Sequence, residues 1–245
     1  MTSEPLIELY QVNLSQYEAG TLETILDDVS FSLPAHSFTT LLGNSGSGRS
    51  EIIEILLGFT KTSSGEIKVS NHVLTDLVES ELDKYRRNCV HFIGPSENLV
   101  PQLTLHQNIL LPHSLNRSNP DLTFFSEVIS VCQLKQDLSA LPESVPHITQ
   151  QKTAIARAIL SPAEIILCEN PCLKLKSDSR LEVLSLLRTA VNEFGKTVLL
   201  ATPEPVDATL TQRVLLLRDG KIIGEVNTPT LFALLSNIQM SEELH

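Results

Sequence analysis

Short apolar runs alternate with amphipathic segments through the middle of the chain. Four of these runs predict fully buried parallel strands, because they are too short for helices and rich in Val, Ile, Leu and Thr. They cover residues 37–43, 89–94, 164–170 and 197–202. The amphipathic segments between them predict helices after Ser50, over 151–160 and over 179–195, with Gly195 at the expected C-cap. Strands that alternate with helices predict an α/β fold with a mostly parallel sheet covered on both faces.

The two ends of the chain follow a different pattern. Residues 6–35 alternate between apolar and polar positions, as strands of an antiparallel sheet do. Near the other end, RVLLLRDGKIIGEV predicts a hairpin that turns at Asp219 and Gly220. Residues 101–145 favour helix but are interrupted by prolines. This stretch is therefore expected to be a helical subdomain inserted into the α/β fold.

Charge and hydropathy narrow the class of protein. The net charge of −11 argues against nucleic acid as a direct partner, because phosphate binding depends on Lys and Arg. No apolar run approaches the ~20 residues needed to cross a bilayer, and the start, MTSEPLIELY, lacks the features of a signal peptide. We therefore expect a cytoplasmic protein that reaches a membrane only through a partner. The four cysteines lie in or near apolar runs, which favours buried reduced thiols over a zinc site.

The stretch LLGNSGSGRS, residues 41–50, matches seven of the eight positions of the phosphate-loop pattern G-x-x-x-x-G-K-[ST]. It follows a predicted strand and precedes a predicted helix, which is the context that a phosphate loop requires. Gly43, Gly46 and Gly48 let backbone N–H groups turn toward a phosphate, and the helix N-terminus favours an anion. Ser50 stands where a hydroxyl would reach Mg²⁺, but Arg49 replaces the lysine.

The surrounding sequence resembles the ATP-binding subunits of ABC transporters. The segment LLGNSGSGRS…ILLGFTKTSSGEIKV is similar to the family's G-x-S-G-S-G-K-S followed by G-x-x-x-P-x-S-G-x-[IV]. The similarity continues through ENLVPQLTLHQNILLP, QQKTAIARAILSPAEIILCENP and RVLLLRDGKIIGE, and thus covers nearly the whole chain. The most similar subgroup serves lipoprotein release and macrolide or peptide efflux.

This resemblance implies one P-loop NTPase cassette over residues 1–245. A RecA-like core with an N-terminal antiparallel β-subdomain would take approximately 1–95 and 160–245, and the inserted helical subdomain would take approximately 96–159. In the family, two cassettes face each other head to tail, with ATP between the phosphate loop of one and the signature motif of the other. Closing and opening of this sandwich moves a membrane permease.

The resemblance also implies which residues would bind ATP and Mg²⁺. The phosphate loop would contribute Gly43, Asn44, Ser45, Gly46, Ser47, Gly48, Arg49, Ser50 and Glu51. Ser50 and Glu169 would hold Mg²⁺, with Glu169 acting through water. The family's adenine-stacking aromatic falls at Gln16, one residue before Tyr17. Tyr17 stacks on adenine if the turn shifts by one residue, and is otherwise a surface tyrosine.

Several functional positions depart from the family pattern. Arg49 is longer and more planar than the lysine it replaces, so it should fit the loop poorly. Pro95 stands at the glutamine that would serve Mg²⁺ and the attacking water. Asn170 replaces the general base, and an amide cannot take a proton from water near neutral pH. Pro203 stands at the histidine that would contact the γ-phosphate, and Lys176 replaces an aspartate.

The signature motif L-S-G-G-Q is also replaced, by Val145, Pro146, His147, Ile148 and Thr149. The family's glycines bring backbone N–H groups close to the γ-phosphate across the dimer. Ile148 adds bulk at such a position, and Pro146 has no N–H to offer. His147 is more simply an incidental histidine than a catalytic one.

These departures favour a degenerate cassette with weak or residual ATP binding and impaired hydrolysis, paired with a catalytically intact second cassette and a membrane permease. Two alternatives remain: an active ATPase subunit that drives export, and a nucleotide-free scaffold. The stretch 96–112 matches the family's surface for a short permease helix. Its apolar residues, among them Leu99, Val100, Leu103 and Leu105, either form that surface or fill the core. The expected location is the cytoplasmic side of the cell membrane, through the permease.

Overall fold

The computed structural model describes residues 5–18, 20–96 and 98–227. The chain divides into two compact units, which are described here one at a time. The first unit comprises residues 1–82 and 199–245, and the second comprises residues 83–198. The chain passes between them within α2 (Glu79–Asn88) and β8 (Thr197–Thr202). The division expected from the sequence, with a helical subdomain over 96–159, stays a prediction.

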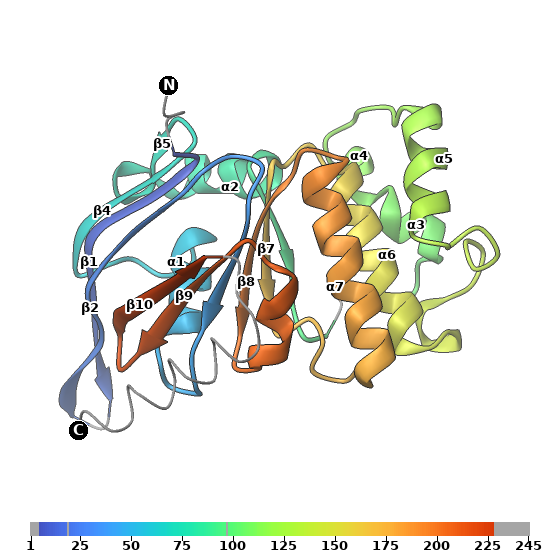
Figure 1. Ribbon diagram of the computed structural model, residues 1–245. Coiled ribbons are helices and arrows are strands. Elements are labelled where there is room, and N and C mark those ends of the chain that lie inside the picture. The colour runs from blue at the N-terminus through green and yellow to red at the C-terminus, as the bar shows by residue number, and fades with distance from the viewer. Residues whose placement is uncertain (1–4, 19, 97, 228–245) are drawn as a thin grey trace. The chain divides into compact units, whose positions relative to one another are not determined.

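The first unit contains a four-stranded antiparallel sheet, whose two long strands β1 and β2 are blue in Figure 1. Its order is β2-β1-β4-β5, formed by β1 (Ile7–Glu18), β2 (Thr21–Leu33), β4 (Ser64–Val69) and β5 (His72–Val73). Buried residues alternate in β1 at Ile7 and Leu9 and, after a bulge, at Val12 and Leu14. The antiparallel pairing of β1 with β2 confirms the antiparallel strands expected over residues 6–35.

The first unit also contains the strand order β10-β9-β3-β8. β3 (Phe38–Leu42) is fully buried and pairs in parallel with β9 (Arg213–Arg218). Helix α1 (Arg49–Leu56) follows β3, and the 3-10 turns η1 (Leu74–Asp76) and η3 (Pro205–Leu210) join other strands. β9 and β10 (Lys221–Asn227) form the predicted hairpin. Its two turn residues, Asp219 and Gly220, have φ of 45° and 74°, as a two-residue hairpin turn demands.

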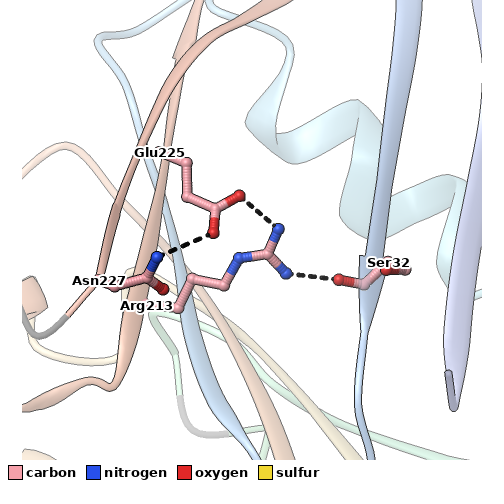
Figure 2. Close-up of polar contacts among 4 residues, drawn as sticks. All are labelled: Ser32, Arg213, Glu225 and Asn227. Atoms are coloured by element: carbon pink, nitrogen blue, oxygen red, sulfur yellow. Dashed lines mark hydrogen bonds and ion pairs between the residues drawn. The ribbon is translucent and has the colours of Figure 1, made fainter. Parts of the chain in front are cut away.

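Arg213 ties this hairpin to β2, as Figure 2 shows. Its Nη1 donates to the carbonyl oxygen of Ser32 at 2.5 Å, and its Nη2 pairs with Glu225 Oε2 at 2.6 Å. Asn227 Nδ2 donates to the other oxygen of Glu225 at 3.3 Å. The hydrogen bond from Arg213 holds the pKa of the Glu225 carboxyl below its usual value. The last strand of the described chain is thereby fixed against the antiparallel sheet of its own unit.

The second unit pairs two short parallel strands with a group of helices. The strands are β6 (Val90–Ile93) and β7 (Ile165–Glu169). The helices are α3 (Leu105–Ile109), α4 (Leu111–Leu115), α5 (Leu122–Val131), the 3-10 turn η2 (Pro142–Ser144), α6 (His147–Leu160) and α7 (Ser177–Asn192). Figure 1 shows α6 and α7 lying side by side, and α6 also packs against α3 and α5. Every residue of α6 from Gln151 to Leu160 is buried, so this helix is the centre of the unit.

The structure confirms the α/β class and has a strand at each of the four predicted positions, but it corrects the burial of β6 and the helix ends. β6 is not fully buried, because His91 and Phe92 are partly exposed. The helix expected over 151–160 begins four residues earlier, at His147, and the one expected over 179–195 spans Ser177–Asn192. The expectation that Gly195 is the C-cap is wrong, because Glu193 caps α7. Gly195 has a φ of 64° and reverses the chain two residues later, where Lys196 N–H donates to Ala190 O at 3.0 Å.

Within the described ranges, no helix is long and apolar enough to cross a membrane. Of the cysteines expected to be buried, Cys132, Cys168 and Cys172 are buried and Cys89 is partly exposed. Burial raises the pKa of Cys132 to about 12 and that of Cys168 further still, so both thiols stay protonated at neutral pH. These thiols therefore behave as small apolar side chains.

Candidate functional site

The predicted phosphate loop joins β3 to α1 in the first unit. A Cβ on Gly43 would lie 2.3 Å from the carbonyl oxygen of Leu217 and 2.6 Å from Ser47 Oγ, so no side chain fits there. Gly48 caps α1 with a φ of 97°, a left-handed conformation that other residues rarely adopt. The glycines of the pattern are therefore required by the fold of the loop, whatever it binds.

Backbone hydrogen bonds from the hairpin turn and within the loop itself fix the shape of the phosphate loop. Gly220 N–H, in the hairpin turn, donates to Ser47 O at 3.1 Å, and Asp27 N–H of β2 donates to Gly220 O at 3.0 Å. Within the loop, Ser47 N–H donates to Asn44 O at 3.2 Å. The loop thus takes its shape from contacts inside its own unit.

A cavity of about 360 Å³ lies beside the loop, which is within the size range of small-molecule sites. Gly43, Asn44, Ser45 and Ser47 line one side of it. Asn44 and Ser45 are exposed, as groups that meet a ligand from solvent must be. The nearby loop after β8 and the hairpin turn complete the wall with Pro203, Leu217, Arg218 and Asp219.

Pro203 therefore lies next to the phosphate loop. Gly43 N–H donates to Thr202 O at 3.4 Å, and this contact joins the two loops. The Thr202 hydroxyl donates to the buried Asp207 carboxylate at 2.8 Å and accepts from Glu204 N–H at 3.2 Å. The geometry of the strand end is thus well defined, but the proline ring offers no hydrogen-bonding group to the cavity.

The sequence reasoning did not single out Arg218 and Asp219 as site residues. Both line the same cavity as the phosphate loop, because the hairpin turn hydrogen-bonds to Ser47. The only sequence signal was the Asp-Gly turn, which indicated a hairpin and not its position. Arg218 adds a positive group that could face an anion in this cavity.

The residues at the start of α1 are less accessible than the loop before them. Arg49 is only 6% exposed, whereas Ser50 and Glu51 are partly exposed. Arg49 also does not belong to the wall of the 360 Å³ cavity. Its guanidinium is therefore placed as a buried group of the helix and not as a group open to solvent.

Tyr17 lies near the end of β1, opposite Leu22 of β2. Its side chain is 80% exposed, and Leu22 is 56% exposed. Gln16, its neighbour, is exposed as well. Two adjacent exposed apolar side chains are compatible with stacking on a base and with a plain surface tyrosine, so the role of Tyr17 stays a prediction.

In the second unit, the loop that follows β6 begins at Gly94 and Pro95. Helix α6 holds this loop with two side chains: Gln151 Nε2 donates to Gly94 O at 3.4 Å, and Arg157 Nη1 donates to Asn98 O at 2.8 Å. Both donors bind backbone carbonyls, so they fix the loop without using the side chain of Pro95. Glu97 lies outside the described residues.

Asn108 of α3 fixes the rest of this loop. Its side chain is fully buried; Oδ1 accepts from Val100 N–H at 2.7 Å, and Nδ2 donates to three carbonyls at 3.0–3.1 Å. These belong to Val100, Leu103 and Thr104. Of the apolar residues expected either to form a partner surface or to fill the core, Leu105 is fully buried, while Leu99, Val100 and Leu103 are partly exposed.

The five residues at the signature position lead into α6. The helix begins at His147, with Pro146 as its N-cap residue, and Gln150 N–H donates to Pro146 O at 3.1 Å. Pro146 and His147 are exposed, while Val145, Ile148 and Thr149 are partly exposed.

Glu169 ends β7, and Asn170 follows it with a left-handed φ of 44°. The Oδ1 of Asn170 is buried and accepts no hydrogen bond from any described residue. This oxygen is an amide acceptor without appreciable basicity. Lys176 serves as the N-cap residue of α7, at the place where the family carries an aspartate.

Comparisons with known proteins agree with this architecture. The profile of the ABC transporter family matches residues 26–173. The chain belongs to the ABC transporter family. It is 27% identical over 229 residues to an ABC transporter ATP-binding protein of Mycobacterium tuberculosis, covering 93% of this chain and 92% of the relative. It is 28% identical over 225 residues to the bacitracin export ATP-binding protein BceA of Halalkalibacterium halodurans, covering 91% and 88%.

Longer relatives and solved structures extend the comparison. The macrolide export ATP-binding/permease protein MacB of Burkholderia thailandensis is 30% identical, and the cassette corresponds to 35% of its length. The bacterial ABC transporter cassette MJ0796, solved as a dimer bound to ADP and Pi, is 27% identical with a TM-score of 0.80 over 91% of this chain and 99% of that one. The Clostridium perfringens protein cbiO1 shares the fold, with a TM-score of 0.83 at 18% identity and coverage of 96% and 94%. The fold is thus that of an ABC transporter ATP-binding cassette.

Proposed function

We propose that this cassette is a degenerate subunit of an ABC transporter, which binds ATP weakly, hydrolyses it poorly and couples to a membrane permease. The observation that carries the proposal is Asn170. It stands where the family's general base is expected, and its buried Oδ1 is an amide oxygen that cannot accept a proton from water near neutral pH. Loss of a proton acceptor typically lowers turnover by 10²–10⁴-fold.

The phosphate loop fits the phosphates of ATP. Its glycine backbone is preshaped, it opens onto a cavity of about 360 Å³, and it is followed by a helix N-terminus. In this proposal Gly43 to Glu51 cradle the phosphates, the Ser50 hydroxyl is a ligand of Mg²⁺, and Tyr17 stacks on the base. Bound Mg²⁺ would screen the charge of the phosphates. The buried Arg49 leaves this cradle with less positive charge facing the ligand than a lysine that extends into it.

The other replaced positions support the same proposal. Pro203 borders the phosphate cavity without a hydrogen-bonding group, and Pro95 begins a loop that is held only through its carbonyls. The first turn of α6 carries Pro146 and Ile148 in place of the open glycine backbone. At each of these positions the backbone conformation is defined, but the side chain lacks the functional group that the family uses there.

The partner that fits this proposal is a second, catalytically intact cassette together with a permease. In a dimer of this chain with an intact cassette, each ATP site uses motifs of both cassettes. The altered signature segment would therefore also weaken the site built on the partner's phosphate loop. Residues 96–112 would face the permease, because Asn108 bonds the backbone of the loop before α3 and the apolar residues Leu99, Val100 and Leu103 are partly exposed. Such an assembly would hold the cassette at the inner face of the cell membrane.

Turnover of Mg²⁺-ATP by the purified chain tests the proposal. We expect no phosphate release above the buffer rate, and binding of a fluorescent ATP analogue that is lost in Gly46→Asp. Gly46 has a φ of 78° and open space at its Cβ, so an aspartate is expected to fold there and repel the phosphates. Turnover that Glu169→Gln abolishes would contradict the proposal and identify an active ATPase. Absence of any nucleotide binding would identify a scaffold.

A further inference from the structure

Arg218 ends β9 at the edge of the sheet where the phosphate loop begins. β9 pairs in parallel with β3, and Leu42 at the end of β3 lies opposite Leu216. The phosphate loop starts directly after Leu42, and Arg218 comes two residues after Leu216. Ligands of open α/β sheets bind at the carboxyl ends of the parallel strands. Arg218 therefore lies at the edge that a ligand of the phosphate loop would occupy.

The backbone after Arg218 is held against two neighbouring segments. Gly220 N–H donates to Ser47 O of the phosphate loop at 3.1 Å, and Gly220 O accepts from Asp27 N–H of β2 at 3.0 Å. A Cβ on Gly220 would lie 2.3 Å from Ile25 O, so the turn and β2 are in close contact. A side chain on such a fixed backbone loses less conformational freedom when it binds a ligand than one on a free loop.

The cavity of about 360 Å³ beside the phosphate loop is lined by Arg218 and not by Arg49. Arg218 is partly exposed and shares the wall with the exposed Asn44 and Ser45 of the loop, whereas Arg49 is only 6% exposed. Among the described residues, Asp219 is the one other charged side chain of this wall. Arg218 is therefore the cation that a ligand in this cavity would meet.

Pro203 and Arg218 flank the phosphate loop on opposite sides. In the strand order β9-β3-β8, Arg218 ends β9 and Pro203 follows β8. The proline offers a ligand no hydrogen-bond donor. The guanidinium of Arg218 presents N–H groups in a planar fork that can bind two phosphate oxygens at once. The favourable contacts for a phosphate group therefore lie on the β9 side of the loop.

We propose that Arg218 binds the phosphate groups of the nucleotide and supplies the positive charge that the buried Arg49 does not. The inference rests on the proposed function, because it takes this cavity as the place of the phosphates. It also gives a physical reason for weak binding, since Asp219 lines the same wall and repels the same anion. Removal of the charge at Arg218 and at Asp219 should therefore change the affinity in opposite directions.

Isothermal titration calorimetry of the full-length chain with inorganic tripolyphosphate tests this inference. Tripolyphosphate carries the charged groups of ATP without its base and sugar, so its affinity reports the phosphate contacts alone. We expect Arg218→Gln to weaken binding about tenfold, because a hydrogen bond between charged groups is lost, and Arg218→Lys to recover part of this loss. Asp219→Asn should strengthen binding about twofold, and Asn tolerates the left-handed φ of 45° at this position.

Lys221→Gln is the matched control, because Lys221 is an exposed cation of the same hairpin that does not line the cavity. It should leave the affinity for tripolyphosphate unchanged, and the ligand-free Arg218 variants should unfold at the same temperature as the wild-type chain. Three results would overturn the inference: no binding of tripolyphosphate to the wild-type chain, equal affinity of the wild type and Arg218→Gln, or equal weakening by Arg218→Gln and Lys221→Gln.

The proposed function can fail separately from this inference. If Arg218→Gln bound the fluorescent ATP analogue as tightly as the wild-type chain does, Arg218 would have no role and the proposed function would stand. Turnover of Mg²⁺-ATP that Glu169→Gln abolishes would contradict the proposed function. An affinity for tripolyphosphate that depends on Arg218 would still support the inference in that case.

Discussion

Two loops of this cassette are built alike but differ in their chemistry. The phosphate loop of the first unit and the loop from Gly94 to Thr104 in the second both follow a buried strand, and both are fixed by hydrogen bonds from within their own unit. The phosphate loop matches its family pattern except at Arg49. The second loop has Pro95 at the position that the sequence comparison assigned to a glutamine, an assignment that stays a prediction.

The difference lies in how each loop is held. The phosphate loop depends on its own glycines as well as on the hairpin, because a Cβ on Gly43 would meet Leu217 O and Gly48 needs a left-handed backbone. The second loop depends on donors outside it, Gln151 and Arg157 of α6 and Asn108 of α3, which bind its carbonyl oxygens. A loop held in this way tolerates a change of side chain without a change of shape. The shape of the second loop is therefore less sensitive to its side chains than the shape of the phosphate loop.

Among the substitutions that test this comparison, Asn108→Ala should cause the largest loss of stability. Asn108 is fully buried and bonds to Val100, Leu103 and Thr104, and its removal leaves those backbone groups to find water or stay unpaired. At ~1 kcal/mol for each hydrogen bond, we expect the free energy of unfolding to fall by about 3 kcal/mol. Urea denaturation followed by circular dichroism would measure it.

Asn88→Ala is the control for that substitution. Asn88 is exposed and makes one hydrogen bond, from Nδ2 to Lys84 O at 3.0 Å. A surface substitution of this kind changes stability by about 0.5 kcal/mol or less. If both variants lost the same stability, the idea that Asn108 organises the second loop would be wrong.

Gly43→Ala probes the first loop in the same assay. The new Cβ would meet a backbone oxygen at 2.3 Å, which cannot move as a side chain can. We expect a loss of about 2 kcal/mol, in the range of overpacked sites, together with loss of nucleotide binding. Gly46→Ala is the matched variant, because space is open at that position and only its φ of 78° is unfavourable. A smaller loss for Gly43→Ala than for Gly46→Ala would contradict the packing argument.

The sequence predicted the elements of the fold better than the contacts between them. The buried strands were recognisable because each is a short run of Val, Ile, Leu and Thr, and the hairpin because Asp-Gly favours a two-residue turn. The start of α6 was missed by four residues, since Pro146, His147 and Ile148 carry no N-terminal capping signal. The cap of α7 was misplaced because Gly195 suits both a cap and the reversal that follows.

The sequence predicted the candidate site only where its residues are close together in the chain and form a recognisable motif. The glycines of the phosphate loop are recognisable within ten consecutive residues. By contrast, Gln151 and Arg157 lie 57 and 59 residues along the chain from the carbonyl groups that they bind. No periodicity links positions so far apart. Arg218 escaped prediction for the same reason, because it joins the phosphate cavity only through the hairpin's contact with Ser47.

The buried cation Lys196 gives a pH-dependent test of the second unit. Its ammonium group donates to Ser161 O at 2.9 Å and Ala163 O at 2.6 Å, and burial lowers its pKa to about 8 from 10.5. The unfolded chain therefore binds more protons between about pH 8 and 10.5, so this residue makes stability rise with pH in that window. Relative to Lys196→Met, the wild-type chain should gain about 2 kcal/mol from pH 8 to 10. Parallel pH profiles of the two proteins in urea denaturation would refute the assignment.

Glu225→Gln should give the smallest effect, in the hairpin that supports the phosphate loop. Glu225 pairs with Arg213 at 2.6 Å but is 40% exposed, so the pair should contribute about 0.5 kcal/mol at neutral pH and less at high salt. Because the pKa of Glu225 is lowered in the folded chain, this contribution is present above 4.5 and is lost as the pH falls through the folded pKa. The two proteins should therefore converge in stability in acid. A loss as large as that of Gly43→Ala would mean that the hairpin, and not the glycine backbone, determines the shape of the phosphate loop.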